Sequence, residues 1–286
     1  MNQHDQTSRR ETAGSSVSPD DAEVITSAKN PRVVDTARLS RRRTRRERGE
    51  YLVEGPNATG EVLAAGVVTA LFATPDRAAE YADCGVEVTV VADHVLARLA
   101  DSQNPQGVVA VARLEAASLD DVLPSDLLVV LEAPSDPGNL GTIIRTADSA
   151  GAAGVVVCGN GVDPWNPKVV RSTVGSLVHL PVVVDVDVVD VLDRCRSAGM
   201  QVVGLDAGGT DEVFTLEDDA TPVAVVLGNE AHGLSEAARA GVDRLLAVPT
   251  FGRAESLNLA AAAAVTVYAA ARGRRGVARA SDAGHD

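Results

Sequence analysis

Short apolar runs alternate with helix-like segments along most of the chain, and the alternation begins near residue 50. The apolar runs are short and rich in β-branched residues, as buried strands are. This alternation predicts helices packed against a sheet. In the first part of the chain the expected strands are Glu50–Val53, Ala70–Ala73, Val86–Val91 and Val108–Ala112. The expected helices between them are Asn57–Ala65, Pro75–Tyr81 and Asp93–Leu99.

The second part of the chain repeats the alternation with strands that are apolar throughout. Such strands are typical of a parallel sheet that is covered by helices on both faces. The expected strands are Leu127–Leu131, Val155–Cys158, Leu180–Val184, Val202–Leu205, Val223–Leu227 and Leu245–Val248. The expected helices are residues 140–151, Lys168–Gly175, Val188–Ala198, Ser235–Ala240 and an alanine-rich helix from about Ser256 to Arg272.

Composition divides the chain into two α/β domains and several connecting or terminal segments. Residues 1–22 are polar and lack periodicity, so we predict a disordered extension there. Residues 115–125 are acidic and contain Pro124, which predicts a linker. We therefore expect a small domain at residues 23–114, a larger domain at 126–273 and a disordered tail at 274–286.

The formal net charge of −14 is typical of a soluble protein and, taken alone, argues against a nucleic-acid partner. The charge is unevenly distributed, because residues 29–48 hold nine Lys or Arg residues and only two Asp or Glu residues. A charge run is most often a solvated helix face. Because Arg binds phosphate groups bidentately, we favour contact with a nucleic-acid backbone. The arginines in question are Arg41, Arg42, Arg43, Arg45, Arg46 and Arg48.

The sequence lacks several common kinds of site. No GxGxxG follows the first strand of either domain, and there is no GxxxxGK[ST] loop or GxSxG turn. The cysteines and histidines have no metal-ligand spacing, so we expect neither a metal nor a disulfide framework. No apolar segment is long enough to span a bilayer and the N-terminus is polar, so we expect a cytoplasmic protein without a membrane partner.

Three polar clusters follow strands of the second domain. The first runs from Asn139 to Arg145, the second is Gly228–Glu230, and the third is Ser256–Asn258. Ligands of open α/β sheets bind at the carboxyl ends of the strands, so we expect the clusters to meet around one pocket. The alternative is a set of ordinary turns in which Gly and Asn supply left-handed backbone geometry.

The strings around these clusters resemble the ordered motifs of the SpoU (TrmH) family of RNA 2′-O-ribose methyltransferases, within the SPOUT superfamily. The strings are DPGNLGTIIRTADSAG, VVLGNEAHGLS and VPTFGRAESLNLAAAAAV, and they occur in the family order. The departures, Ala231, Thr250 and Ala260, are small residues that a loop or helix accepts. Residues 25–66 are similar to the L30e-like substrate-binding domain that many family members carry.

The resemblance implies an α/β fold of SPOUT type, with a C-terminal trefoil knot in the parallel sheet and a small L30e-like domain before it. It also implies an obligate homodimer that binds S-adenosyl-L-methionine, with each site completed by the partner chain. The cofactor contacts implied by position are Leu227, Gly228, Asn229, Val248, Pro249, Ser256 and Leu257. The residues implied for catalysis are Asn139, Arg145, Glu230, Ser256 and Asn258.

The resemblance gives Arg145 a central role, sometimes as the base. A guanidinium is a poor base, because it stays protonated at any pH that a protein tolerates. We therefore predict that Arg145 stays charged, holds the target phosphate and stabilises the developing alkoxide. The alternative for Arg145 alone is a helix-surface ion pair with Asp148.

The function that these features favour is S-adenosylmethionine-dependent 2′-O-ribose methylation of structured RNA. Ribosomal RNA of the 23S type is preferred, because the additional domain and the arginine run suit a large folded target. A transfer RNA is the alternative substrate. A non-catalytic RNA-binding dimer and a Rossmann-like small-molecule enzyme are alternatives of other classes. We expect no DNA partner, because DNA lacks the acceptor hydroxyl.

Overall fold

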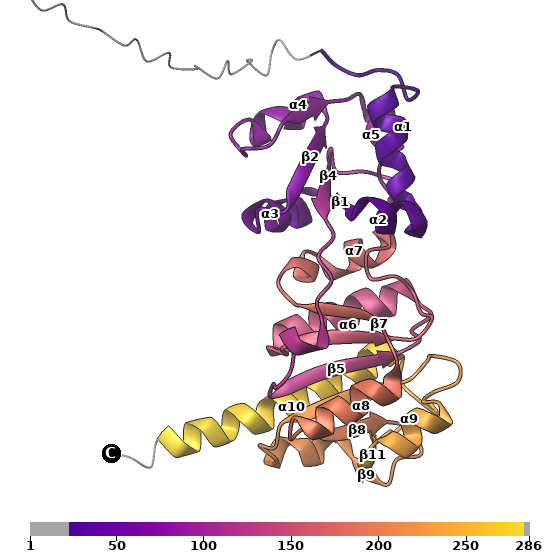
Figure 1. Ribbon diagram of the computed structural model, residues 1–286, viewed down its shortest axis with the longest axis vertical. Coiled ribbons are helices and arrows are strands. Elements are labelled where there is room, and N and C mark those ends of the chain that lie inside the picture. Colours follow the sequence, from indigo (N-terminus) through magenta and orange to yellow (C-terminus); the bar gives the residue numbers. More distant parts are fainter. Residues whose placement is uncertain (1–22, 283–286) are drawn as a thin grey trace, which may run out of the picture.

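The computed structural model describes residues 23–282, with side chains for residues 23–274. The disordered extension predicted for residues 1–22 and the last part of the predicted tail, 283–286, lie outside the described residues. Two sheets lie one above the other along the long axis of the molecule, and the chain passes from the first to the second near residue 120 (Figure 1).

The first sheet is mixed and has the strand order β1-β4-β2-β3. Its strands are β1 (Glu50–Glu54), β2 (Val68–Ala73), β3 (Val88–Val90) and β4 (Val108–Arg113). β4 pairs antiparallel with β1 and β2, and β3 pairs parallel with β2. The helices around the sheet are α1 (Pro31–Ala37), α2 (Arg42–Arg48), α3 (Pro56–Ala64), α4 (Pro75–Ala78) and α5 (Asp93–Leu96). All four strands expected from the apolar runs are therefore present.

The second sheet is parallel and has the strand order β7-β6-β5-β10-β8-β11-β9. Its strands are β5 (Leu127–Glu132), β6 (Gly154–Cys158), β7 (Val182–Val186), β8 (Gln201–Leu205), β9 (Asp211–Glu212), β10 (Val223–Leu227) and β11 (Arg244–Ala247). Its helices are α6 (Pro137–Ala150), α7 (Pro167–Thr173), α8 (Val188–Ser197), α9 (Glu236–Gly241) and α10 (Leu259–Asp282). The prediction of a parallel sheet is confirmed; the trefoil knot stays a prediction.

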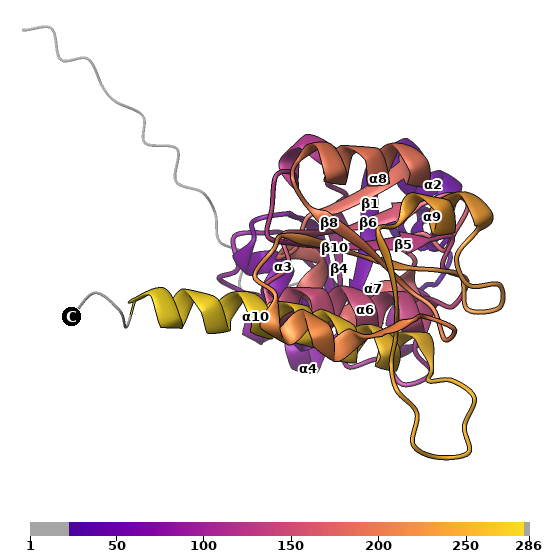
Figure 2. The ribbon, with the colours of Figure 1, turned by 90° about the horizontal axis from the view of Figure 1, so that it is seen from below.

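The strand β5 shows why its sequence is apolar at every position. Leu127, Val129 and Leu131 belong to a core that includes residues of α6 and α10. Leu128 and Val130 belong to a second core, which includes residues of α8 and α9. Successive side chains of a strand point to opposite faces, so a sheet between two helical layers requires apolar residues throughout. Figure 2 shows α10 and α6 on one side of the sheet and α8 on the other.

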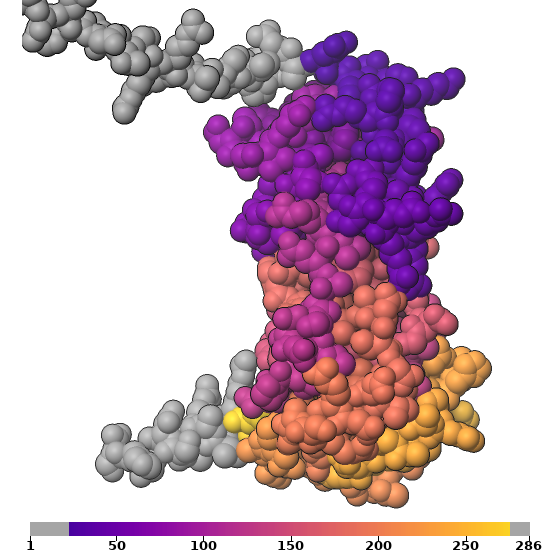
Figure 3. Space-filling model, viewed as in Figure 1, coloured from indigo at the N-terminus to yellow at the C-terminus, as the bar shows by residue number. Residues whose placement is uncertain are grey.

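The first of these cores continues into the small domain. It includes Tyr51 and Val62 of the first sheet and helix α3, together with Trp165 before α7. The predicted linker is also ordered: Ala117 forms a parallel bridge with Val183, and Val122 is buried. The space-filling view accordingly shows two lobes joined over a broad waist (Figure 3).

The C-terminal helix is longer than expected. The sequence predicted an end near Arg272 and a disordered tail from residue 274, whereas α10 runs to Asp282. Ala and Arg are good helix formers, so the segment can continue the helix. Gly273, inside this helix, gives room to another segment: a Cβ there would come within 2.2 Å of the Leu216 carbonyl oxygen and 2.6 Å of that of Asp219.

Within the described part of the chain, no helix is long and apolar enough to cross a membrane. The same residues contain no group of three or more His, Cys, Asp or Glu side chains that could hold a metal ion.

The close approach at Gly273 yields a prediction for stability. Gly→Ala in an open helix stabilises a protein by about 0.4–1 kcal/mol. We expect Gly273→Ala instead to destabilise the protein by about 1–3 kcal/mol, because the methyl group overpacks the contact with residues 216–219. The measurement is the midpoint of urea unfolding.

The matched control is Gly60→Ala in α3. Gly60 is exposed, and a Cβ added there would have no atom within 4 Å. Gly60→Ala should raise the unfolding midpoint. A rise of equal size for Gly273→Ala would contradict the packing of α10 described above.

Candidate active site

The carboxylate of Glu230 joins two loops at the carboxyl ends of neighbouring strands. Glu230 lies in the β10–α9 loop (residues 228–235), and the β5–α6 loop (residues 133–136) donates to it. The backbone N–H of Ser135 donates to Glu230 Oε2 over 2.8 Å, and the Ser135 hydroxyl donates to the same oxygen over 2.6 Å. The backbone N–H of Asp136 donates to Glu230 Oε1 over 3.0 Å. Because β5 and β10 are adjacent and parallel, these loops lie side by side.

Asn139 connects this pair of loops to a third. Its side-chain amide donates to Glu230 Oε1 over 3.2 Å, and its Oδ1 accepts from the side-chain amide of Asn258 over 3.0 Å. Asn258 ends the β11–α10 loop (residues 248–258) and caps α10, because its Oδ1 accepts from the backbone N–H of Ala260 over 2.9 Å. The three polar clusters therefore meet within one chain, as expected.

The environment of Glu230 keeps it ionised. Partial burial acts to raise the pKa of this carboxyl, but the hydrogen bonds from Ser135 and Asn139 outweigh burial and lower its pKa to about 2. At neutral pH Glu230 is therefore an anion whose oxygens already accept four hydrogen bonds. Such a group organises loops and has little tendency to take up a proton.

Gly228 allows the β10–α9 loop to fold back on itself. A Cβ at residue 228 would lie 2.1 Å from the carbonyl carbon of Gly233 and 2.3 Å from the nitrogen of Leu234. Asn229 and Gly233 exchange backbone hydrogen bonds of 2.9 and 2.8 Å across this turn. Residue 228 has to be a glycine because the loop's own backbone approaches it so closely.

A pocket of about 390 Å³ lies among the three loops. Seven residues predicted for cofactor binding or catalysis line it: Asn139, Asn229, Glu230, Val248, Ser256, Leu257 and Asn258. The predicted cofactor contacts Leu227, Gly228 and Pro249 do not line the pocket. Leu227 is fully buried in β10, whereas Gly228 and Pro249 are neighbours in the sequence of lining residues.

Sequence reasoning missed a fourth wall of the pocket. Leu205, Asp206 and Ala207 line it from the carboxyl end of β8, the strand between β10 and β11. The position of these residues after an apolar strand was the available signal, because parallel strands end at the same edge of a sheet. Thr250 and Glu255 of the β11–α10 loop also line the pocket.

The lining residues fit the S-adenosylmethionine that the resemblance implies. Leu205, Val248 and Leu257 offer apolar surface to a purine ring, and the pocket has the size of a small-ligand site. Glu255 brings a carboxylate that suits a ligand with an ammonium group and a sulfonium, whereas the carboxylate of Asp206 is already paired with Arg239.

Arg145 does not line this pocket. It lies on α6, and its exposed side chain makes no hydrogen bond or ion pair with any described residue. The alternative of an ion pair with Asp148 is not observed, because Asp148 instead contacts Nδ1 of His179 at 3.3 Å. Within one chain, the predicted site is therefore assembled without its arginine.

The arginines of α2 have several different environments. Arg45 is 1% exposed, and its guanidinium pairs with Asp163, which lies in the β6–α7 loop (residues 159–166) of the second domain. Its Nη1 donates to the carbonyl oxygens of Leu39 and Ser40 over 2.8 and 2.9 Å. The prediction of RNA contact is therefore wrong for Arg45, because its donors are used inside the protein.

Three more arginines of the run have carboxylate partners. Arg46 donates to both oxygens of Asp185 over 2.7 and 2.9 Å, and Arg43 pairs with Glu47 at 2.7 Å. Arg48 pairs with Asp35 and Glu50. Arg41 and Arg42 are exposed and have no carboxylate partner among the described residues.

Comparison with known proteins places this arrangement in a family. The profile of the SpoU rRNA Methylase family matches residues 126–268, and that of the MRM3-like substrate binding domain matches residues 30–110. The chain is 32% identical over 248 residues to the 23S rRNA (guanosine(2553)-2′-O)-methyltransferase RlmP of Bacillus subtilis, covering 85% of this chain and 97% of that protein. It is 36% identical over 253 residues to the 23S rRNA (uridine(2479)-2′-O)-methyltransferase of Streptomyces viridochromogenes, covering 83% and 88%.

Solved structures agree with these sequence relatives. The AdoMet-bound rRNA methyltransferase from Sinorhizobium meliloti superimposes with a TM-score of 0.79 at 32% identity, covering 88% of this chain and 98% of that one. The SpoU methyltransferase AviRb from Streptomyces viridochromogenes in complex with AdoMet superimposes with a TM-score of 0.76 at 34% identity, covering 86% and 100%. With its two sheets, its three converging loops and these matches, the chain belongs to the SpoU rRNA methylase family.

Proposed function

We propose that the protein transfers a methyl group from S-adenosylmethionine to a ribose 2′-hydroxyl of 23S-type ribosomal RNA. The observation that carries the proposal is the contact of Asn139 with both Glu230 and Asn258 at the edge of one pocket, in a chain of this family. The two named relatives modify 23S rRNA at a guanosine and at a uridine, which supports the RNA class and leaves the nucleotide open.

S-adenosylmethionine, when bound, supplies an electrophilic methyl group, so the chain must hold the accepting hydroxyl in line and stabilise its negative charge. Asn139 and Asn258 hold each other through their amides, and Glu230 fixes Asn139 from the other side. Leu205, Val248 and Leu257 keep water away from the apolar part of the pocket. Ser256 lies among these groups with its hydroxyl available to orient a ribose.

The missing arginine is supplied, in this proposal, by a second copy of the chain. The support is that the side chain of Arg145 is exposed and unpaired among the described residues, while exposed apolar side chains lie in the β11–α10 loop and on α10. Phe251 is 94% exposed and Leu257 is 43% exposed, both in the β11–α10 loop, and Tyr268 on α10 is 51% exposed. This loop extends away from the body of the chain (Figure 2). An exposed apolar patch of this kind suits a homodimer interface.

The function is tested by incubating the purified protein with tritiated S-adenosylmethionine and total RNA from a strain that lacks the gene. Ribose methylation is then mapped by mass spectrometry. The proposal predicts one new 2′-O-methyl group in 23S rRNA. A methyl group only on transfer RNA would move the enzyme to the alternative substrate, and no transfer would favour the non-catalytic RNA-binding dimer.

Removal of Arg145 should abolish transfer and spare the cofactor. We expect Arg145→Ala to lower the transfer rate by at least about a hundredfold, in the range of a lost oxyanion donor. Because Arg145 lies outside the pocket, the dissociation constant of S-adenosylmethionine, measured by calorimetry, should change less than about twofold. Arg194→Ala, on α8 across the sheet, is the control and should be fully active.

Co-expression of two strongly impaired variants, each with a small residual activity, tests the origin of the arginine. Random pairing of Arg145→Ala with Glu230→Gln gives mixed dimers in half the cases, each with one intact site, so activity should return to about a quarter of wild type. If no activity returns although mixed dimers form, Arg145 acts within its own chain.

Protonation of Glu230 should loosen the three loops. Its pKa in the folded protein, about 2, lies below the ordinary value of 4.5, so the carboxylate stabilises the fold fully above pH 4.5. That contribution is lost as the pH falls from about 4.5 towards 2. The difference in unfolding free energy between wild type and Glu230→Gln should therefore be constant at neutral pH and shrink below pH 4.5 in urea titrations. A difference that does not change with pH would contradict this account of the carboxylate.

Arg41, which precedes α2, and Arg42, its first residue, should contribute to RNA affinity through charge. Arg41→Gln and Arg42→Gln should weaken binding of a 23S rRNA fragment, and each should reduce the slope of log K against log salt by about 0.7–0.9. Filter binding between 50 and 200 mM salt measures the slope. An unchanged slope would remove these residues from the RNA surface, and Lys168→Gln on α7 is the control.

A further inference from the structure

We propose that the buried ion pair between Arg45 and Asp163 positions the active site. The ion pair fixes the β6–α7 loop, this loop fixes the β5–α6 loop, and the β5–α6 loop holds Glu230. This inference rests on the proposed function, since it assigns positioning residues for that reaction. Arg45 lies in the small domain and Glu230 in the large one, and a continuous series of short contacts joins them.

The first contact crosses between the domains. Nε of Arg45 donates to Oδ2 of Asp163 over 3.0 Å, and the two side chains are 1% and 9% exposed. The other carboxylate oxygen of Asp163 accepts from the backbone N–H of Trp165 over 3.0 Å. The charge pair therefore fixes the backbone of the β6–α7 loop, in addition to holding the domains together.

The second contact joins the β6–α7 loop to the β5–α6 loop. The backbone N–H of Val162, next to Asp163, donates to the Pro134 carbonyl oxygen over 2.8 Å. Gly161 packs so closely on Pro134 that a Cβ at residue 161 would lie 2.7 Å from Pro134 Cδ and 2.9 Å from its nitrogen and oxygen. The position of Pro134 is thus determined by the loop that Arg45 holds.

The third contact reaches the carboxylate. Ser135 and Asp136, which directly follow Pro134, donate both backbone N–H groups to Glu230. Ala133, which directly precedes Pro134, has a φ of +47°, a conformation that non-glycine residues rarely adopt. Its N–H donates to the Cys158 carbonyl oxygen over 2.9 Å, and its own carbonyl oxygen accepts from the Asn229 side chain over 2.8 Å. Strain of this kind persists only where the surroundings fix the backbone.

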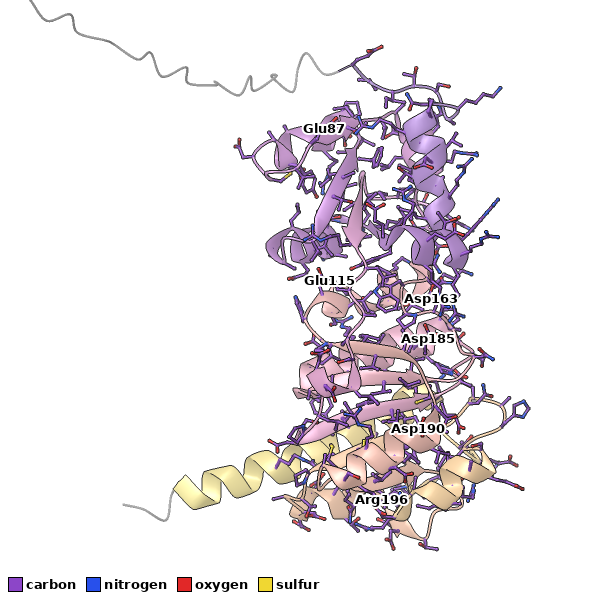
Figure 4. All side chains as sticks on the ribbon, in the orientation of Figure 1. Glu87, Glu115, Asp163, Asp185, Asp190 and Arg196 are labelled. Carbon is purple, nitrogen blue, oxygen red and sulfur yellow. The ribbon has the colours of Figure 1, made fainter. Side chains whose placement is uncertain are left out.

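A second arginine of α2, Arg46, also contacts the second domain close to the Arg45 pair. Asp185, the partner of Arg46, has a φ of +59° and lies where the pairing of β6 with β7 shifts by one residue. Such a bulge redirects a side chain, here towards Arg46. Asp163 and Asp185 lie close together below α2 in Figure 4. Arg42 adds a longer contact, from Nη1 to the Gly161 carbonyl oxygen at 3.4 Å.

Another ion pair between the domains, with no hydrogen bond to the β5–α6 loop in the described part of the chain, serves as the comparison for the Arg45 pair. Arg171 of α7 pairs with Asp101 of the small domain at 2.6 Å. Neither residue has a hydrogen bond to the β5–α6 loop among the described residues. This pair is more exposed than the Arg45 pair, so breaking it shows only what the loss of a weaker contact between the domains does to the active site.

The series of contacts from Arg45 to Glu230 is called the path below. The test compares two variants that alter the path with one variant outside it, all in the full-length protein. Asp163→Asn weakens the ion pair, and Gly161→Ala displaces Pro134 while leaving both charges in place. Asp101→Asn is the control for the loss of an ion pair between the domains, and Gly161→Ala is the variant that tests the contacts without breaking any ion pair. Hydrogen–deuterium exchange of peptides covering residues 133–139 reports on the loop without requiring activity, and single-turnover methyl transfer at saturating cofactor and RNA reports on the reaction.

We expect faster exchange at residues 133–139 in both path variants and wild-type exchange in Asp101→Asn. The single-turnover rate should fall about tenfold or more in the path variants, since displacements of about 1 Å can cost up to about a hundredfold. The KM for cofactor should stay within twofold. In a Glu230→Gln background, Gly161→Ala should lower the rate less than about twofold further, because the path ends at that carboxylate.

Unchanged exchange in Gly161→Ala would overturn the inference, and so would an equal loss of rate in the wild-type and Glu230→Gln backgrounds. If the wild-type protein methylates no RNA, the proposed function fails, while the exchange experiment still decides whether the ion pair controls the loop.

Discussion

The arrangement of the candidate active site depends on one ionised carboxylate, which links its own loop to the neighbouring β5–α6 loop and to the start of α6. Glu230 accepts from the backbone of Ser135 and Asp136 and from the side chain of Asn139, which in turn accepts from Asn258. Hydrogen bonds to a charged acceptor are stronger than those between neutral groups, so an anion is suited to hold loops that have little apolar surface of their own. The residues that face the ligand are consequently held by a residue that need not react.

The sheet explains why those loops are adjacent at all. β5, β10, β8 and β11 lie side by side and run in the same direction, so the four segments that follow them leave from one edge. Their apolar sequences serve two cores at once, and this fixes the register of each strand. The small domain shares one of these cores through Tyr51 and Val62, which makes the relative position of the two domains part of the fold rather than the property of a free hinge.

Much of this was predictable from the sequence, and the exceptions have physical reasons. Every strand except β9 could be predicted from the alternation of apolar runs and helices. The meeting of Asn139, Glu230 and Asn258 could be predicted as well, because parallel strands end at the same edge of a sheet. The burial of Arg45 could not, since its partner Asp163 is 118 residues away and neighbouring arginines of the same run are exposed. The separation of Arg145 from the pocket was likewise invisible, because helical spacing alone does not show which neighbours a side chain meets. The wall formed by Leu205–Ala207 was missed because its residues carry no distinctive motif.

The position of β10 also has a consequence for biosynthesis. Residues 223–227 pair on one side with 127–131 and on the other with 201–205, so the middle of the large sheet is completed by a strand made late. While the ribosome is still adding those residues, β5 and β8 each present an open edge lined with unpaired backbone groups, and such edges promote aggregation. Premature termination before residue 223 would therefore yield an aggregation-prone fragment with no ligand site, rather than an enzyme of lower activity.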